Sequence, residues 1–164
     1  MTTLPNDRSH GRPIHLVNIS GGKDSTATAL LAAESGRDFM LVMADTGNEH
    51  PATVEHAHKL ADFLGRTLHI AKMDFADKIA RKREFIQTKW RDKGVSETII
   101  AAALDVFQPT GNPFLDLCIW KGRFPSRKAQ FCTEWLKANA VGKILDDLLL
   151  TAPVVQWLGV RRDE

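Results

Sequence analysis

The chain alternates between two patterns of hydrophobic residues. Short runs rich in hydrophobic and β-branched residues, typical of strands, cover residues 14–19, 39–44, 67–71 and 154–160. Longer segments with helical spacing cover residues 25–34, 51–64, 75–93, 99–107 and a stretch from about 130 towards 150. This alternation predicts an α/β fold of the Rossmann type: an open, mostly parallel, twisted sheet with helices on both faces.

The same pattern predicts which side chains face the core. On the first three helices these are Ala27, Leu30 and Leu31, then Val54, Ala57, Ala61 and Leu64, then Ile79, Phe85 and Ile86. The run at 39–44 is almost wholly hydrophobic, as in a strand buried on both faces of a parallel sheet. A basic loop is expected between Pro113 and Gln130. With no repeat and no internal boundary, residues 14–164 are expected to form one domain after a flexible lead-in at residues 1–13.

Composition narrows the class of protein. Hydrophobic residues make up 43% and charged residues 26%, as in soluble globular domains. The net charge is only +2, so no strong field indicates nucleic acid or a membrane as a partner. The chain has neither an apolar run of the ~18 residues needed to span a membrane nor a signal-peptide pattern, and its two cysteines are expected to be reduced thiols. We therefore expect a cytoplasmic protein.

One local stretch departs from this balance. Residues 121–128 contain four cations and no acid: Lys121, Arg123, Arg127 and Lys128. Such a cluster is typical of a solvated face, but it would also fit a polyanion. Nucleic acid therefore stays open as a partner, with Trp120 as a side chain that could stack on a base.

A Gly-Gly loop between the first strand and the first helix is the strongest chemical signal. It consists of Ser20, Gly21, Gly22, Lys23, Asp24, Ser25 and Thr26, and we call it the phosphate loop. The backbone N–H groups at the start of a helix, together with the helix dipole, favour an anion. Glycines let the backbone approach the ligand closely, the hydroxyls add donors, and Lys23 adds a cation. Asp24 could cap free amides or hold a water of a Mg²⁺ ion.

Four segments, in order along the chain, resemble a known family. The phosphate loop resembles the Ser-Gly-Gly-x-Asp-Ser signature of the PP-loop ATP pyrophosphatase (adenine nucleotide alpha hydrolase-like) superfamily. Asp45, Thr46 and Gly47 look like the Asp-Thr-Gly segment of the phosphoadenosine phosphosulfate (PAPS) reductase family. The other two resemblances are Phe131-Cys132-Thr133 with Leu136-Lys137, and the Gly-x-Arg block from Gly159 through Arg161 to Glu164.

The resemblance implies a role for each segment. The phosphate loop would grip phosphate, with Lys23 and Asp24 also catalytic. Asp45, Thr46, Gly47 and Lys137 would lie beside the nucleotide. Arg161 would act in catalysis by pairing bidentately with phosphate or sulfate oxygens. Because the loop, Asp45 and Arg161 each follow a predicted strand, we expect them at the carboxyl edge of one sheet.

Three hypotheses about the reaction stay open. An intact loop favours ATP with Mg²⁺, cleaved between the α and β phosphates in adenylation or sulfur transfer. The reductase hypothesis needs a thiolate that the family places in a cysteine-bearing tail beyond the Gly-x-Arg block, which a chain ending at Glu164 would lack. A domain that binds a nucleotide without turning it over is the third. A sulfur donor or a thioredoxin-like protein is the implied protein partner, and a homo-oligomer is expected.

Metal and cluster sites are not expected. An iron–sulfur cluster takes four thiolates, and Cys118 and Cys132 supply two. His56 and His58 are two residues apart on a predicted helix and so face different directions. No protein metal site is therefore predicted, and Mg²⁺ would arrive with the nucleotide.

Overall fold

The computed structural model describes residues 11–160. Residues 1–10, which are most of the predicted lead-in, and residues 161–164 lie outside the described part. The elements run β1 (Ile14–Ile19), α1 (Lys23–Glu34), β2 (Phe39–Asp45), α2 (Pro51–Phe63), β3 (Leu68–Lys72), α3 (Ala76–Phe85), the π-helical turn η1 (Ile86–Trp90), α4 (Glu97–Val106), α5 (Pro113–Lys121), the π-helical turn η2 (Thr133–Ala138), α6 (Asn139–Leu149) and β4 (Val154–Trp157). No helix within residues 11–160 is both long and apolar enough to cross a bilayer.

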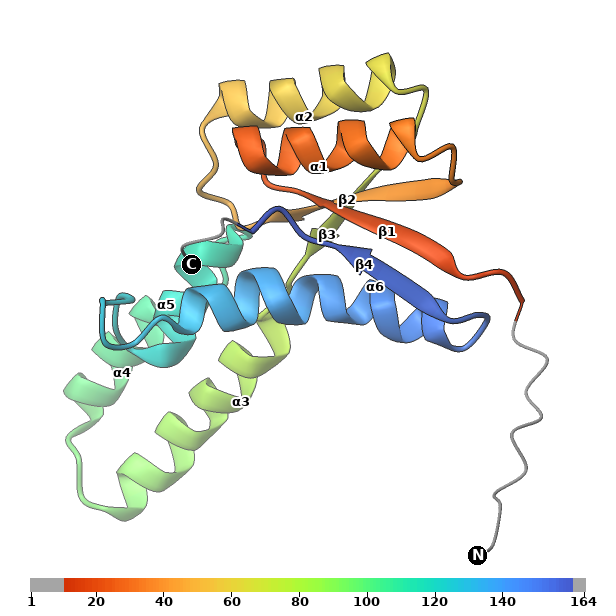
Figure 1. Cartoon of the computed structure of the whole chain (residues 1–164). Helices are drawn as coiled ribbons and strands as arrows, with labels where there is room; N and C mark the ends of the chain where they lie inside the picture. Colours follow the sequence, from red (N-terminus) through yellow and green to blue (C-terminus); the bar gives the residue numbers. More distant parts are fainter. Residues whose placement is uncertain (1–10, 161–164) are drawn as a thin grey trace, which may run out of the picture. The chain divides into compact units, whose positions relative to one another are not determined.

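The strands form one sheet in the order β3-β2-β1-β4. β1 pairs in parallel with β2 and with β4, so the first and last strands of the described chain are neighbours (Figure 1). Ile19 at the end of β1 pairs with Met43 in β2, which puts the carboxyl ends of these two strands at the same edge. The predicted α/β class with a parallel sheet is confirmed.

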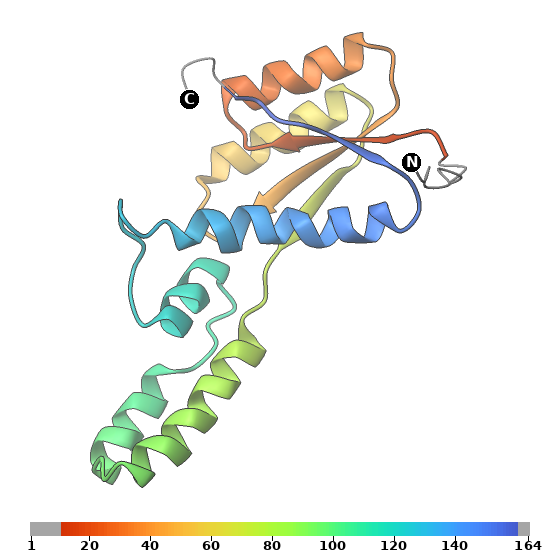
Figure 2. The same cartoon turned by 60° about the horizontal axis from the view of Figure 1, so that its bottom comes forward.

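The described residues divide into two compact units. The first contains residues 11–43, 51–69 and 142–160, and the second contains residues 44–50 and 70–141. In the first unit, α1 and α2 lie on one face of the strands, while residues 142–149 of α6 lie on the other face (Figures 1 and 2). This is the predicted two-sided arrangement of helices.

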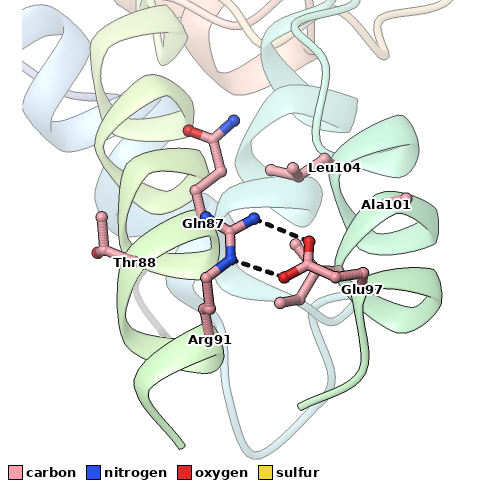
Figure 3. A pocket seen from close by; sticks show the side chains of 7 residues that line it. Gln87, Thr88, Arg91, Glu97, Ala101 and Leu104 are labelled. Carbon is pink, nitrogen blue, oxygen red and sulfur yellow. Dashed lines mark hydrogen bonds and ion pairs between the residues drawn. The ribbon is translucent and has the colours of Figure 1, made fainter. Parts of the chain in front are cut away.

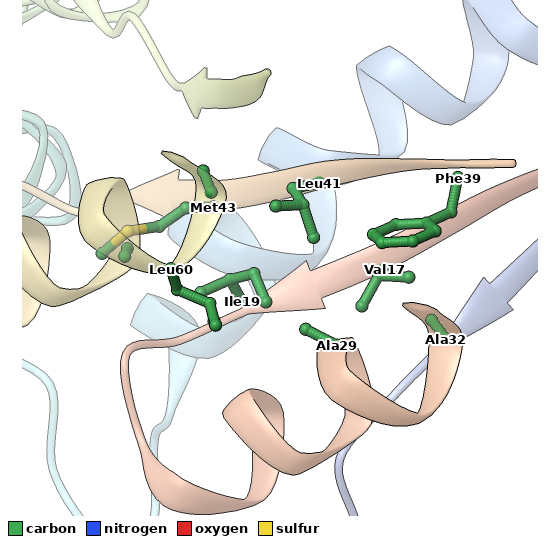
Figure 4. Packing of buried hydrophobic residues seen from close by; sticks show 10 residues of the cluster. Val17, Ile19, Ala29, Ala32, Phe39, Leu41, Met43 and Leu60 are labelled. Carbon is green, nitrogen blue, oxygen red and sulfur yellow. The ribbon is translucent and has the colours of Figure 1, made fainter. Parts of the chain in front are cut away.

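The core of the first unit lies between the strands and the helices α1 and α2 (Figure 4). Val17 from β1 and Leu41 from β2 are fully buried there, and Ala29 and Ala32 of α1 pack against the same cluster. Alanine at these positions lets the helix approach the strands closely. Each fully buried Val or Leu side chain contributes about 1.5–3 kcal/mol to folding.

The predicted inner face of α1 is wrong. Leu31 is 59% exposed and Leu30 is also exposed, whereas the buried residues of this helix are Ser25, Ala29 and Ala32. The larger side chains suggested the wrong face, because close packing selects the small residues here. On α2 the predicted stripe is confirmed: Ala57 and Ala61 are buried, and Val54 and Leu64 pack against the same core.

The second unit is mostly helical. Ile79 and Ile86 are buried as predicted, but Phe85 is 46% exposed and does not face the core. The fully buried Phe75 instead stacks on Trp120, with their ring centroids 5.8 Å apart.

The expected basic loop after Pro113 begins with a helix, α5, which the sequence analysis missed. The Asn112 side chain caps it by accepting the Leu115 N–H at 3.0 Å, and Pro113 occupies the first turn. Gly122 ends the helix in the left-handed conformation, with φ of 68°.

Candidate functional site

The phosphate loop connects β1 to α1, as its sequence predicts. Gly21 has a φ of +74°, a conformation that favours glycine, and a Cβ at this position would lie 2.2 Å from Thr53 Cγ2 of α2. Gly22 is the N-cap of α1 and has no side chain to bond the first helical amides. Within residues 11–160, the N–H groups of Gly21, Gly22 and Lys23 have no acceptor. The loop therefore presents unpaired donors at the positive end of a helix dipole.

Hydroxyl groups hold the loop in shape from inside. Ser25 is buried, and its Oγ donates to the Gly22 carbonyl at 2.9 Å while accepting the Ser20 N–H at 3.1 Å. The Ser20 hydroxyl also donates to Ser25 Oγ, at 3.2 Å. Ser25 thus fixes the loop from inside, and its predicted contact with a nucleotide stays a prediction.

The charged groups of the loop differ in their surroundings. Lys23 is exposed, and no carboxylate in the described part of the chain forms an ion pair with it. Asp24 is half-buried in the first turn of α1, where the helix dipole favours a carboxylate. A lysine ammonium that has no counter-ion beside unpaired amides is suited to an anionic ligand.

His56 joins the loop from α2, a contact that the sequence analysis missed. Its Nε2 lies 2.9 Å from Thr26 Oγ1, which itself donates to the Gly22 carbonyl at 3.0 Å. The two residues are 30 positions apart, so no local spacing signals the contact.

Gly159 brings the chain after β4 against the start of α1. A Cβ on Gly159 would lie 2.7 Å from the carbonyl carbon of Asp24 and 2.8 Å from the Ser25 nitrogen. Only a residue without a side chain fits this approach. The glycine of the predicted Gly-x-Arg block therefore packs on the phosphate-loop helix, whereas Arg161 lies outside the described residues.

In the second unit, the Asp-Thr-Gly segment is held by its own contacts. Asp45 Oδ1 accepts the Gly47 N–H at 2.9 Å, and Asp45 Oδ2 lies 3.3 Å from Lys72 Nζ. The Glu49 carboxylate accepts both the N–H of Thr46, at 3.1 Å, and its hydroxyl. These bonds fix the turn after β2.

The missed helix α5 anchors this turn. The Asn112 side chain donates to the Gly47 carbonyl at 2.8 Å, and a Cβ on Gly47 would lie 2.7 Å from Pro113 Cδ. The buried Asp116 accepts the N–H and hydroxyl of Thr110 at 2.6 and 2.7 Å. Gly47 thus has a packing reason for being glycine, besides any contact with a nucleotide.

The remaining predicted groups lie in or next to α5 and η2. Lys137 is exposed on η2. Cys118 is buried and Cys132 is half-buried, and both are free thiols. Burial raises the pKa of the Cys118 thiol, with a smaller contribution from the neighbouring Cys132. Cys118 is therefore a weak nucleophile at neutral pH.

A cavity of about 350 Å³ lies elsewhere in the second unit, between η1 and α4 (Figure 3). Arg91 and Glu97 form a two-point ion pair in its wall, with N–O distances of 2.6 and 2.8 Å. The hydrogen bonds to the Glu97 carboxylate raise the pKa of Arg91, and the same bonds to the guanidinium lower the pKa of Glu97. No residue predicted from the sequence as part of the site lines this cavity, and its only charged groups neutralise each other.

The donor set of the phosphate loop suits a metal carried by a ligand. Among residues 11–160, no three His, Cys, Asp or Glu side chains come together as a metal site. Magnesium is commonly bound by one or two carboxylates together with substrate phosphates. Asp24 provides one carboxylate in the phosphate loop, which fits Mg²⁺ bound mainly to a nucleotide.

Comparison with known proteins gives the same family as the motifs. Residues 14–108 match the model of the phosphoadenosine phosphosulfate reductase domain. The chain is 44% identical over 165 residues to an uncharacterized 37.8 kDa protein of Escherichia phage 186, and 27% identical over 154 residues to the uncharacterized nin region protein ORF290 of Escherichia phage lambda. Each match covers 92% of this chain but 48% and 49% of the relative, so the chain spans about half the length of these relatives.

A shorter match reaches a named enzyme. Over 75 residues, or 46% of the chain, the sequence is 33% identical to the 7-cyano-7-deazaguanine synthase of Helicobacter acinonychis, of which the match covers 33%. The family model and this relative both carry the names of enzymes. The chain belongs to the phosphoadenosine phosphosulfate reductase domain family.

Proposed function

We propose that this chain binds an adenine nucleotide through the phosphate loop and cleaves ATP between the α and β phosphates. The proposal is supported by the start of α1, where the N–H groups of a Gly-Gly loop and the ammonium of Lys23 lie together and have no partner within residues 11–160. Backbone donors, a helix dipole and a lysine together suit the β and γ phosphates of a nucleotide.

In this proposal an oxygen of an acceptor attacks the α phosphorus. The bond from that phosphorus to the bridging oxygen breaks, and pyrophosphate leaves with the electron pair. Lys23 neutralises charge on the leaving pyrophosphate, and Asp24 holds a water of the Mg²⁺ ion that the nucleotide carries. Mg²⁺ supplies further neutralisation of phosphate charge when bound. Arg161 is proposed as a second cation for phosphate oxygens.

The other predicted contacts remain proposals. Thr46, Gly47 and Lys137 would bind the nucleotide. The Asp45 carboxylate already bonds Gly47 and Lys72. We therefore propose that Asp45 shapes its turn and contacts the ligand through the backbone around it.

Reduction of PAPS is the second candidate, favoured by the family model that matches residues 14–108. A thiolate would attack the sulfur of PAPS to give a thiosulfonate, while the S–O bond breaks and the adenosine bisphosphate leaves with the electron pair. A dithiol of a thioredoxin-like partner would then release sulfite and become a disulfide. Cys118 is poorly suited to this attack, because burial raises its pKa. The candidate therefore requires a thiol other than Cys118.

The deciding experiment compares equilibrium binding of ATP with Mg²⁺ and of PAPS, by calorimetry, on the chain and on Lys23→Ala. Charge-assisted hydrogen bonds contribute about 1.5–3 kcal/mol, so the variant is expected to bind ATP roughly 10- to 150-fold more weakly. Lys143→Ala, which removes another exposed lysine from the first unit, is the matched control and should bind like wild type. AMP and pyrophosphate are then assayed in the ATP samples.

Each outcome has a distinct meaning. Preference for ATP that depends on Lys23, with pyrophosphate release, supports the proposal. Tight ATP binding without pyrophosphate favours a nucleotide-holding domain of a larger complex. Preference for PAPS favours the reductase candidate. Equal losses in both lysine variants would contradict a phosphate site at Lys23.

A further inference from the structure

A basic segment of the second unit is not used by the proposed function. The stretch from 117 to 133 contains Lys121, Arg123, Arg127 and Lys128 and no acidic residue. Arg123, Arg127 and Lys128 are exposed, and Lys121 is half-buried. In the described part of the chain none of the four forms an ion pair with a carboxylate. Within residues 11–160, the segment therefore carries a concentrated positive charge that no carboxylate neutralises.

Two of these cations occupy the tip of a tight turn. Ser126 and Ala129 bond each other through both N–H groups, at 3.2 and 2.9 Å to the carbonyl oxygens. Arg127 and Lys128 are the two residues between them. The Gln130 side chain adds a bond to the Arg127 carbonyl at 3.4 Å. These bonds close the turn, so that the backbone presents Arg127 and Lys128 together at its tip.

Aromatic rings accompany the cations. Phe124 is 68% exposed, and its ring lies 6.4 Å from that of Phe114. The Arg123 guanidinium lies 5.6 Å from the centroid of the Phe131 ring. A phenylalanine ring exposed among cations stays in unfavourable contact with water, and it offers a flat surface on which another ring can stack.

The start of the segment is fixed by a tryptophan pair. Lys121 Nζ lies 4.2 Å from the Trp120 ring centroid and 5.1 Å from that of Trp135. Lys78 Nζ, from α3, lies 4.9 and 4.8 Å from the same two rings. Cation–π contacts thus hold two ammonium groups at one ring pair, and neither has a carboxylate partner within the described residues.

We propose that residues 121–128, together with Lys78, bind single-stranded nucleic acid. The cations contact successive phosphates, and Phe124 stacks on a base that is free of a duplex. Charge alone would also suit an acidic peptide, but the exposed ring among arginines favours a ligand that has both phosphates and flat bases. The inference rests on the second unit alone and does not depend on the proposed nucleotide chemistry.

The test measures fluorescence anisotropy of a labelled 20-nucleotide single-stranded DNA of mixed sequence with the full chain, over a series of salt concentrations. Release of counterions contributes about −0.7 per phosphate contact, so three or four contacts predict a slope of log affinity against log salt between about −2 and −3. The same sequence as a duplex is expected to bind more weakly, because its bases are already stacked.

Two variants separate the parts of the surface. Arg127→Ala with Lys128→Ala should reduce the magnitude of the salt slope by about 1.4. The matched control, Arg81→Ala with Lys82→Ala, removes an exposed Arg-Lys pair from α3 of the same unit and should leave the slope unchanged.

Phe124→Ala should weaken binding roughly 5- to 150-fold at constant slope. Its control is Phe63→Ala, which removes a phenylalanine that is 78% exposed on α2. Urea unfolding of every variant checks that the fold is kept.

Several results would overturn the inference. They are absence of DNA binding at low salt, equal losses in a variant and its matched control, or binding of poly-glutamate or of phosphatidylserine vesicles as tightly as the single strand. Loss of ATP binding in Lys23→Ala would not affect DNA binding, so the two proposals fail independently.

Discussion

Gly159→Ala tests the close approach between the chain after β4 and the start of α1. The added Cβ would lie 2.7 Å from the Asp24 carbonyl carbon and 2.8 Å from both the Asp24 oxygen and the Ser25 nitrogen. Ordinary contacts begin at 3.4 Å, so the two segments must separate by about 0.7 Å. All three atoms belong to the backbone and cannot rotate away.

The expected cost follows from this geometry. Overpacking of this kind lowers the free energy of unfolding by about 1–3 kcal/mol. With a urea dependence of about 2 kcal/mol per molar, the unfolding midpoint falls by about 0.5–1.5 M. The assay is urea unfolding followed by tryptophan fluorescence in a background with Trp90, Trp120 and Trp135 replaced by Phe, which leaves Trp157 of the first unit as the reporter. ATP affinity should fall as well, because Asp24 and Ser25 belong to the phosphate loop.

The matched control is Gly142→Ala in α6. No atom lies within 4 Å of a Cβ on Gly142, and alanine is favoured over glycine in a helix by up to about 1 kcal/mol. This variant should unfold at an equal or higher urea concentration and bind ATP like wild type. If Gly159→Ala instead unfolds within 0.2 M of wild type, the reasoning about backbone contact at Gly159 is refuted.

Two further predictions concern the second unit. Gly47→Ala should lower the free energy of unfolding by about 2–4 kcal/mol, because it combines a φ of +76° with a Cβ placed 2.7 Å from Pro113 Cδ. Asn112→Ala, which removes a helix cap, should lower it by about 1 kcal/mol. Urea unfolding in which Asn112→Ala is the less stable of the two variants would contradict this. Iodoacetamide should alkylate the half-buried Cys132 before the buried Cys118. Because burial raises the pKa of Cys118, its alkylation rate should rise only at a pH above the pKa of an ordinary thiol. Mass spectrometry that finds Cys118 modified first at neutral pH would exclude this order.

Patterns that depend on neighbouring residues were predicted correctly. β1 and β2 are short hydrophobic runs that end at polar loops, and their positions and parallel pairing were as expected. The stripe Val54, Ala57, Ala61 and Leu64 on α2 also follows from periodicity alone. In such segments, the spacing of hydrophobic residues within one helix or one strand is enough to predict which side chains are buried.

Errors arose where side-chain size or distant contacts decide. On α1, the small Ala29 and Ala32 are buried and the larger Leu31 is exposed. The distance between the helix and the strands favours small side chains here, and the sequence of the helix does not give this distance. The missed helix α5 did carry local signals: an Asn cap, a Pro in the first turn and a terminal Gly. Gly111 and Pro113 are also typical of a loop that ends a helix, and that interpretation is wrong here because Pro113 occupies the first turn of α5.

The candidate site divides in the same way. The phosphate loop could be predicted because its glycines, hydroxyls and lysine are contiguous. The contact of His56 with Thr26 and the close packing of Gly159 on Asp24 depend on segments far apart in the chain. The roles proposed for Lys137, Asp45 and Arg161 in nucleotide binding remain predictions.

The position of β1 between β2 and β4 has a consequence for synthesis of the chain. His15 in β1 accepts a hydrogen bond from the Trp157 indole, 142 residues later. At 5–20 residues per second, a ribosome needs about 7–30 s to make the intervening chain. Throughout that time one edge of β1 has no partner strand, and unpaired edges invite association with other chains. The sheet is therefore complete only after β4 has been made. Before that point the nascent chain most needs protection by a chaperone.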